Sequence, residues 1–111
     1  LASADAVVEE IRAVGGEAIA DTANVADLEQ VTAMVKKTVD TWGRVDILVN
    51  NAGILREKSF KKMSLDEWDL VINVHLMGSA YVTWHAWPIM YEQNYGRVVF
   101  TSSVSGRPLD L

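Results

Sequence analysis

Apolar residues follow two different spacings along this chain. In three stretches they recur every three or four positions, which is the spacing of one buried face of a helix. Helices are therefore expected from Ser3 or Asp5 to 14, over 27–42 and over 65–93. Short apolar runs between them predict strands at 18–20, 45–49 and 97–101. The order α-β-α-β-α-β is typical of an α/β protein whose parallel sheet has helices on both faces.

The predicted helices have recognisable ends. Side chains that accept from the first backbone N–H groups are expected at Ser3 or Asp5, at Asp27 with Gln30, and at Ser64 with Glu67. Gly15 and Gly43 are expected to end the first two helices, since glycine takes the left-handed conformation readily. Pro88 is expected to bend or end the third helix near its last turn.

The same spacing predicts which residues are buried. The second helix is expected to bury Leu28, Val31, Val35, Val39 and Trp42, and the third to bury Trp68, Val71, Ile72, His75, Ser79, Val82, Ala86 and Met90. The strand at 45–49 is rich in β-branched residues, so we expect it to be covered on both faces. His85 falls off the apolar face and is expected at the surface.

Composition narrows the classes of function. The 111 residues suit one domain, half of them are apolar, and the net charge is −5, with the ten basic residues scattered. This argues against nucleic-acid binding, which needs a basic patch. No apolar run is long enough to predict a membrane span. Without cysteine there is no thiolate nucleophile or disulfide, which fits a reducing compartment, and no pair of His or acidic residues has metal-binding spacing.

Candidate chemistry lies where the predicted strands end, because ligands of open α/β sheets bind outside the carboxyl ends of the strands. Three segments follow strands there: 24–25, 50–53 and 102–106. Asn50-Asn51-Ala52-Gly53 comes directly after a buried strand, and the runs 24–27 (Asn-Val-Ala-Asp), 43–49 and 96–103 are in register with it. Together they resemble the short-chain dehydrogenase/reductase family. The stretches 51–56, 74–76 and 93–97 are similar to one branch, the (3R)-hydroxyacyl-CoA dehydrogenase part of peroxisomal multifunctional β-oxidation enzymes and its bacterial relatives.

The resemblance implies a partial Rossmann-type, doubly wound parallel sheet and an NAD or NADP site. In that site Asn24 would pair with the adenine amine and Val25 would lie against the base. The backbone of Asn51, Ala52 and Gly53 would approach the adenosine ribose, since small residues leave room there. The resemblance also implies that Asn50 ties neighbouring strands together. From the residues alone, Asn24 serves equally well as a local turn before a helix.

The resemblance also implies two catalytic positions. Ser103, followed by Val104, would hold the substrate oxygen, and His75 falls where most members carry an asparagine that anchors a proton-relay water. Structural roles are the alternatives. Ser102 and Ser103 could be capping hydroxyls, and a histidine on an apolar helix face is more often a core residue with a backbone partner. Trp68, Trp84 and Trp87 fit a core or a subunit interface better than a ligand platform.

We therefore expect residues 1–111 to form the central part of a single dinucleotide-binding domain. The family's Gly-rich phosphate loop would precede Leu1, its Tyr-x-x-x-Lys motif would follow Leu111, and the segment alone would be inactive. The implied reaction interconverts a secondary alcohol and a ketone, with a 3-hydroxyacyl-CoA/3-oxoacyl-CoA pair as substrate. The alternatives are a 3-oxoacyl carrier-protein reductase or other secondary-alcohol dehydrogenase, and a non-catalytic interaction module. A homo-oligomer formed through helix 65–93 is expected, in the cytoplasm or, in a eukaryote, the peroxisome.

Overall fold

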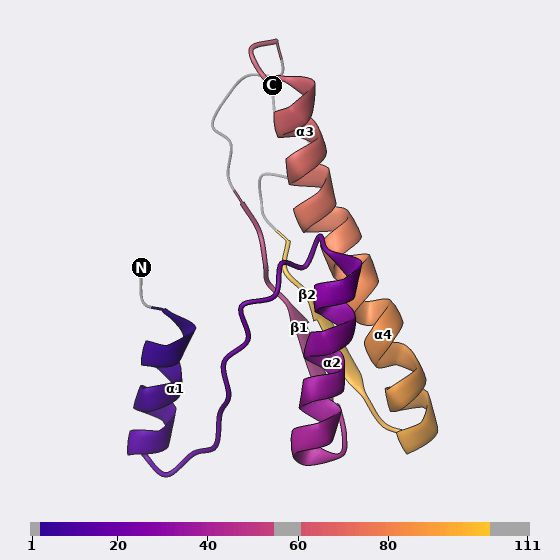
Figure 1. Ribbon diagram of the computed structural model, residues 1–111. Helices are drawn as coiled ribbons and strands as arrows, with labels where there is room; N and C mark the ends of the chain where they lie inside the picture. The colour runs from indigo at the N-terminus through magenta and orange to yellow at the C-terminus, as the bar shows by residue number, and fades with distance from the viewer. Residues whose placement is uncertain (1–2, 55–60, 103–111) are drawn as a thin grey trace, which may run out of the picture.

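The computed structural model describes residues 3–54 and 61–102. The elements are α1 (Ala4–Ala13), α2 (Leu28–Trp42), β1 (Ile47–Asn50), α3 (Leu65–Ile72), the π-helical η1 (Asn73–Met77), α4 (Gly78–Gln93) and β2 (Arg97–Phe100). Because α3, η1 and α4 follow one another without a gap, they form the single long helix expected over 65–93 (Figure 1). Among the described residues, no helix is both long and apolar enough to cross a lipid bilayer.

The two strands pair in parallel, as the alternating order predicted. Ile47 lies opposite Arg97 and Asn50 opposite Phe100. The pairing continues just beyond the last strand residues, because the Thr101 N–H donates to the Asn50 carbonyl at 3.1 Å. The carboxyl ends of both strands therefore meet at one edge, where the candidate residues follow.

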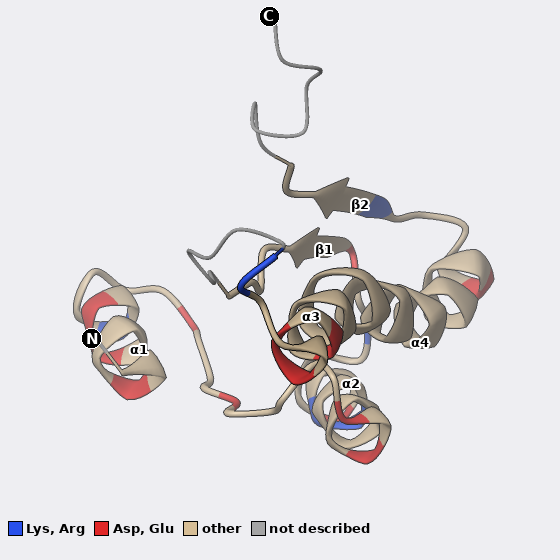
Figure 2. Cartoon of the chain, turned by 90° about the horizontal axis from the view of Figure 1, so that it is seen from above, with Lys and Arg blue, Asp and Glu red and all other residues tan. Residues whose placement is uncertain are grey.

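The core lies between the sheet and two helices on the same side of it. Figure 2 shows α2 and the long helix together on one face of the strand pair. Val31 of α2 is fully buried, and Val82, Ala86 and Met90 of α4 are buried at the four-residue spacing that the sequence predicted. The rest of the predicted stripes is only partly covered, and Leu28 is 51% exposed.

The opposite face of the sheet is uncovered in the part of the chain described. Ile47 and Val49 of β1 are 63% and 57% exposed, while Leu48 and Asn50 are half-buried. Within residues 3–54 and 61–102 the helices cover one face of the strand pair, so the expected cover of 45–49 on both faces is wrong for this part of the chain. Alternate side chains of a strand point to opposite faces, so a single helical layer covers only one set. Helix α1 stands beside the sheet rather than on it (Figures 1 and 2).

Residues 18–20 form no strand, contrary to the prediction. No strand of the described chain pairs with them, so side chains bind their carbonyl groups instead. The Arg12 guanidinium donates to the Ala18 carbonyl at 3.0 Å, and the Lys37 ammonium donates to the Ala20 carbonyl at 2.6 Å. An apolar run forms a strand only where a neighbouring strand pairs with its backbone.

The predicted capping residues are confirmed, but Gln30 accepts from the Asn24 N–H rather than from that of Asp27. Ser3, Asp27 and Ser64 cap their helices, and Ser64 forms the full reciprocal box with Glu67. Gly43 takes the left-handed conformation that ends α2, with φ of 76°. Pro88 was expected to bend or end its helix, and it does not end it, since α4 continues to Gln93.

The start of the strand pair is fixed by side chains. Gln93 Oε1 accepts from the Val45 N–H at 2.9 Å, and Gln93 Nε2 donates to the Val45 carbonyl at 2.8 Å. The amide thus binds both backbone groups of Val45, as the backbone of a neighbouring strand would, just before β1 begins. Beside it Arg44 binds Asp46, and this hydrogen bond holds the pKa of the Asp46 carboxyl below its usual value.

Substitution of Val31 tests this account of the core. Val31→Ala is expected to lower the free energy of unfolding by about 2 kcal/mol, because it removes two fully buried methyl groups. The same substitution at Val7, which is 45% exposed on α1, is the matched control and should change it by less than about 0.5 kcal/mol. Urea unfolding measures both, and equal effects would contradict the assigned core.

Candidate functional site

Two small cavities lie at the carboxyl ends of the strands, on either side of the turn that follows β1. One of about 220 Å³ is lined by Asn50, Asn51, Ala52, His75, Ser79, Thr101 and Ser102. The other, of about 250 Å³, is bounded by Val25 and Gly78 as well as by Asn50–Ala52. The structure thus brings the 24–25, 50–53 and 102 segments to one sheet edge, as the strand order predicted.

The turn after β1 is held by its two asparagine side chains. Asn50 Nδ2 donates to Thr83 Oγ1 at 3.1 Å, which ties the strand to α4. Asn51 Oδ1 accepts from Thr101 Oγ1 at 2.9 Å, which ties the ends of the two strands together. The side chain that joins the strands is therefore that of Asn51, not that of Asn50 as expected. Residues 51–53 are exposed, so their backbone is open to a ligand.

His75 lies over the last residue of this turn. A Cβ atom on Gly53 would come within 2.5 Å of His75 Cε1, so the imidazole can approach only because residue 53 is glycine. His75 Nε2 lies 2.7 Å from the Ile54 carbonyl oxygen and 3.0 Å from the Ile54 nitrogen. The expected backbone partner is therefore present, but the expected burial is wrong, because His75 is exposed. The π-helical segment adds a residue to the turn and shifts His75 away from the apolar stripe.

Asn24 and Val25 make different contacts. Asn24 Oδ1 accepts from the Ala26 N–H at 3.0 Å, and the Asn24 N–H donates to Gln30 Oε1 at 2.9 Å, so Asn24 makes the local turn. Its contact with adenine stays a prediction. Val25 packs on the backbone of α4, where a Cβ on Gly78 would lie 2.6 Å from Val25 Cγ2.

Sequence reasoning missed several residues of the site. Gly78 is buried at the start of α4, and a glycine inside a helical pattern, which costs about 1 kcal/mol relative to alanine, was the signal of close backbone approach. Thr83 and Thr101 bind the two asparagines, and only the fold shows that they lie within reach. Ser103 lies outside the described residues; its neighbour Ser102 lines the smaller cavity.

His85 is not the surface residue that we expected. It is half-buried, its Nε2 lies 2.9 Å from Thr32 Oγ1 of α2, and its Nδ1 lies 2.7 Å from the Tyr81 carbonyl oxygen. It therefore joins α4 to α2 and belongs to neither cavity.

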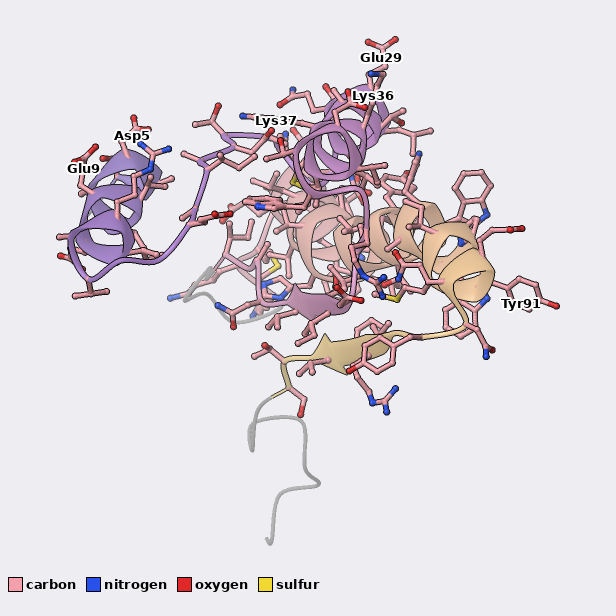
Figure 3. The ribbon with its side chains drawn as sticks, turned by 90° about the horizontal axis from the view of Figure 1, so that it is seen from below. Asp5, Glu9, Glu29, Lys36, Lys37 and Tyr91 are labelled. Carbon is pink, nitrogen blue, oxygen red and sulfur yellow. The ribbon has the colours of Figure 1, made fainter. Side chains whose placement is uncertain are left out.

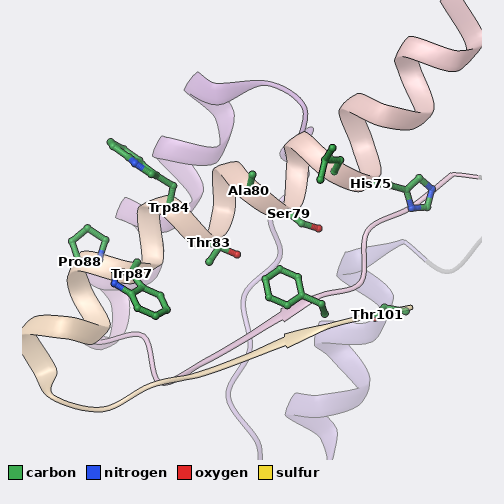
Figure 4. Close-up of a pocket in the computed structure, with 10 residues that line it drawn as sticks. His75, Ser79, Ala80, Thr83, Trp84, Trp87, Pro88 and Thr101 are labelled. Atoms are coloured by element: carbon green, nitrogen blue, oxygen red, sulfur yellow. The ribbon is translucent and has the colours of Figure 1, made fainter. Parts of the chain in front are cut away.

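An apolar groove of about 700 Å³ continues from the smaller cavity along α4 (Figure 4). It begins at His75 and Thr101 and ends at Trp87 and Pro88. Phe100 and Trp84 are among the residues that line it. An elongated apolar group that entered at the sheet edge would find a hydrophobic surface there.

The smaller cavity is lined mostly by polar side chains and the larger one mostly by apolar side chains, and among residues 3–54 and 61–102 neither is lined by an Asp, Glu, Lys or Arg side chain. Hydroxyl, amide, imidazole and backbone groups are the available partners, so the site can orient a ligand by hydrogen bonds. Within residues 3–54 and 61–102, no three His, Asp or Glu side chains are placed to hold a metal ion.

Comparison with known proteins identifies the class. The model of the short chain dehydrogenase family matches residues 1–109, so the chain belongs to that family. Its solved relatives share the Rossmann-type α/β fold that the sequence predicted. One of them, a metagenomic short-chain oxidoreductase in complex with NADP, superposes with a TM-score of 0.86 at 28% identity, over 97% of this chain and 50% of that one.

Two curated relatives indicate the branch of the family. The chain is 51% identical over 104 residues to peroxisomal multifunctional enzyme type 2 of Mus musculus, covering 94% of this chain and 14% of that protein. It is 45% identical over 104 residues to a 3-oxoacyl-[acyl-carrier-protein] reductase of Synechocystis, covering 94% of this chain and 42% of that protein. The chain thus spans less than half of either relative.

Gly78 provides a test of the geometry between the turn and the long helix. In an ordinary helix interior Gly→Ala is favourable by about 1 kcal/mol. Here Gly78→Ala should instead destabilise by about 1–3 kcal/mol, because the new methyl group meets Val25. In a Val25→Ala background the same change should be neutral or stabilising. Thermal unfolding of the four proteins measures the coupling, and a stabilising Gly78→Ala in the unaltered background would disprove the contact.

Proposed function

We propose that the protein uses NAD or NADP to interconvert a secondary alcohol and a ketone, with 3-hydroxyacyl-CoA and 3-oxoacyl-CoA as the substrate pair. The observation that carries this proposal is the meeting of Val25, Asn51, Ala52, His75 and Ser102 at one sheet edge. Membership of the short chain dehydrogenase family and the similarity to the mouse peroxisomal enzyme support it.

The cofactor is proposed to bind across the turn after β1. Its adenine would lie near Asn24 and Val25, and its ribose against the exposed backbone of 51–53. The open turn and the uncharged cavities favour binding through hydrogen bonds and close packing. The NADP in the metagenomic relative supports this class of cofactor, and the proposal covers both NAD and NADP. The hydride chemistry belongs to the cofactor, while the chain positions it.

Catalysis is proposed to use Ser103 to hold the reacting oxygen, next to Ser102 in the cavity wall. Proton transfer by a positioned group contributes roughly 10²–10⁴-fold, and the family assigns it to the tyrosine of a Tyr-x-x-x-Lys motif. None of the three tyrosines of this sequence has lysine four residues later. Because the chain spans half of the NADP-bound relative, we propose that it forms the central part of a dinucleotide-binding domain whose remainder supplies the motif.

The second candidate is a 3-oxoacyl carrier-protein reductase, which the identity to the Synechocystis enzyme favours. Both candidates act on the same carbonyl position and differ in the carrier of the acyl chain. A non-catalytic interaction module is the third, supported by the exposed aromatic side chains of α4. By analogy with the mouse relative we propose a peroxisomal location in a eukaryote and a cytoplasmic one otherwise.

The assay of the whole gene product distinguishes these candidates. Reduction of NAD or NADP by 3-hydroxyacyl-CoA is expected. In the reverse direction, the kcat/KM for 3-oxoacyl-CoA is expected to be larger than that for the matching 3-oxoacyl carrier-protein thioester. Ser103→Ala should lower kcat about 10²–10³-fold, because one hydrogen bond to the reacting oxygen is lost, and should leave cofactor affinity unchanged. A preference for the carrier-protein thioester would favour the second candidate. A folded protein without turnover on either would favour the third.

We also propose that α4 packs against a second copy of the protein. Trp84, Trp87 and Tyr91 are 72%, 60% and 78% exposed at helical spacing, and Tyr91 points away from the body of the molecule (Figure 3). Large aromatic side chains of this kind are enriched in subunit interfaces.

Sedimentation analysis tests the interface. Trp84→Glu places a charge in the aromatic stripe and should convert the oligomer to a smaller species without loss of helix content. Glu29→Gln, at an exposed position of α2, is the control and should leave the oligomer intact (Figure 3). A monomeric wild-type protein would refute this assignment.

A further inference from the structure

Two lysines lie just before the long helix. Lys61 and Lys62 form an exposed turn ahead of the Ser64 cap. Within residues 3–54 and 61–102, no hydrogen bond or ion pair joins either lysine side chain to another of these residues. The other basic side chains of the same ranges each contact a carboxylate, a carbonyl oxygen or an aromatic ring, and they are Arg12, Lys36, Lys37, Arg44 and Arg97. The ammonium groups of Lys61 and Lys62 are therefore available to an anionic ligand.

The position of this pair in an acidic chain favours such a ligand. The net charge is −5, yet four of the ten basic residues fall within positions 56–62. Neighbouring like charges repel each other, so an anion that contacts both lysines relieves that repulsion. Asp66 is an exposed carboxylate of the first turn of α3, and it forms no ion pair with either lysine. Lysine presents a compact point charge and is a common partner of phosphate groups.

The long helix sets the distance between these lysines and the edge of the sheet. At a rise of 1.5 Å per residue, Ser64 at its start and His75 at the smaller cavity are about 15 Å apart along the helix axis. Figure 1 shows α3 reaching beyond the carboxyl ends of both strands, and in Figure 2 the blue segment before α3 lies on its β1 side. A ligand that reacts at the sheet edge and carries its anionic group at that distance can contact both places.

An acyl-CoA has this arrangement of groups. Its thioester is joined through the extended pantetheine arm to a diphosphate and a ribose 3′-phosphate, so its charge lies far from the carbonyl that reacts. The cofactor fits the lysines less well, because its adenine and ribose are proposed to lie at Val25 and residues 51–53, on the sheet edge itself. A carrier-protein thioester offers only one phosphodiester in place of these phosphates.

We propose that Lys61 and Lys62 bind the phosphate groups of the CoA moiety while the thioester end of the substrate lies at the cavity lined by His75 and Ser102. The pair thereby determines specificity, since it favours CoA thioesters over thioesters that lack the nucleotide. This inference rests on the proposed function, because it takes a 3-oxoacyl thioester as the substrate. It adds a binding site for the end of that substrate opposite to the reacting carbonyl.

Reduction of two thioesters by the whole gene product tests the proposal. One is a 3-oxoacyl-CoA, and the other is the N-acetylcysteamine thioester of the same acyl group, which lacks the nucleotide. Lys61→Gln combined with Lys62→Gln should raise the KM for the CoA thioester roughly three- to tenfold at unchanged kcat, because exposed ion pairs are individually weak. The kcat/KM for the truncated thioester and the Kd for NAD or NADP should not change.

Lys36→Gln combined with Lys37→Gln is the matched control. It removes the same charge from another pair of exposed neighbouring lysines, on α2, and should leave the KM for the CoA thioester unchanged (Figure 3). Added salt should raise the wild-type KM for the CoA thioester and should affect the Lys61→Gln/Lys62→Gln variant less, because ions screen exposed charges.

Three results would refute the lysine site. They are a wild-type KM for the CoA thioester in the Lys61→Gln/Lys62→Gln variant, an equal loss on both thioesters, which indicates damage to the fold, and a loss confined to the carrier-protein thioester, which favours the second candidate function. Turnover of the CoA thioester by the wild type together with the first result would leave the proposed function standing. If the wild-type protein reduces none of the three thioesters with either cofactor, the proposed function fails and the lysine site fails with it.

Discussion

The parallel pairing of β1 with β2 is the constraint on which the site depends. It sets Asn50 opposite Phe100, so that the segments after both strands leave the sheet at the same edge. The Gln93 amide fixes one end of this pairing and the Asn51–Thr101 hydrogen bond fixes the other. A slip of one residue would turn every side chain of the slipped strand to the other face and separate the residues around the cavities.

The long helix supplies the second half of the site from a single continuous element. Its buried stripe of Val82, Ala86 and Met90 anchors it to the sheet and to α2. Three residues of this helix contact the site. Gly78 lets Val25 approach closely, Thr83 binds Asn50, and His75 lies within hydrogen-bond distance of Ile54. The rigid packing of one end therefore orients the polar groups at the other.

Sequence patterns predicted those features that depend on neighbours along the chain. The caps at Asp27 and Ser64, the helix over 65–93 and the strand ends carrying 50–53 and 102 were all readable from spacing and residue type. The failures involve partners distant in sequence. An apolar run such as 18–20 becomes a strand only beside another strand, and the side chain of Asn51 rather than that of Asn50 joins the strands because Thr101 lies opposite it. The exposure of His75 followed from a π-helical turn, which a regular 3.6-residue spacing does not anticipate.

The amide of Gln93 makes the molecule sensitive to a slow chemical change. Its Nε2 group donates to the carbonyls of Val45 and Tyr95 at 2.8 Å and 3.1 Å. Hydrolysis of that amide would exchange the NH₂ group for an oxygen, so that a carboxylate would face two backbone oxygens that can only accept. Ageing at this one side chain would therefore loosen the beginning of both strands, although it alters neither the core nor any residue of the cavities.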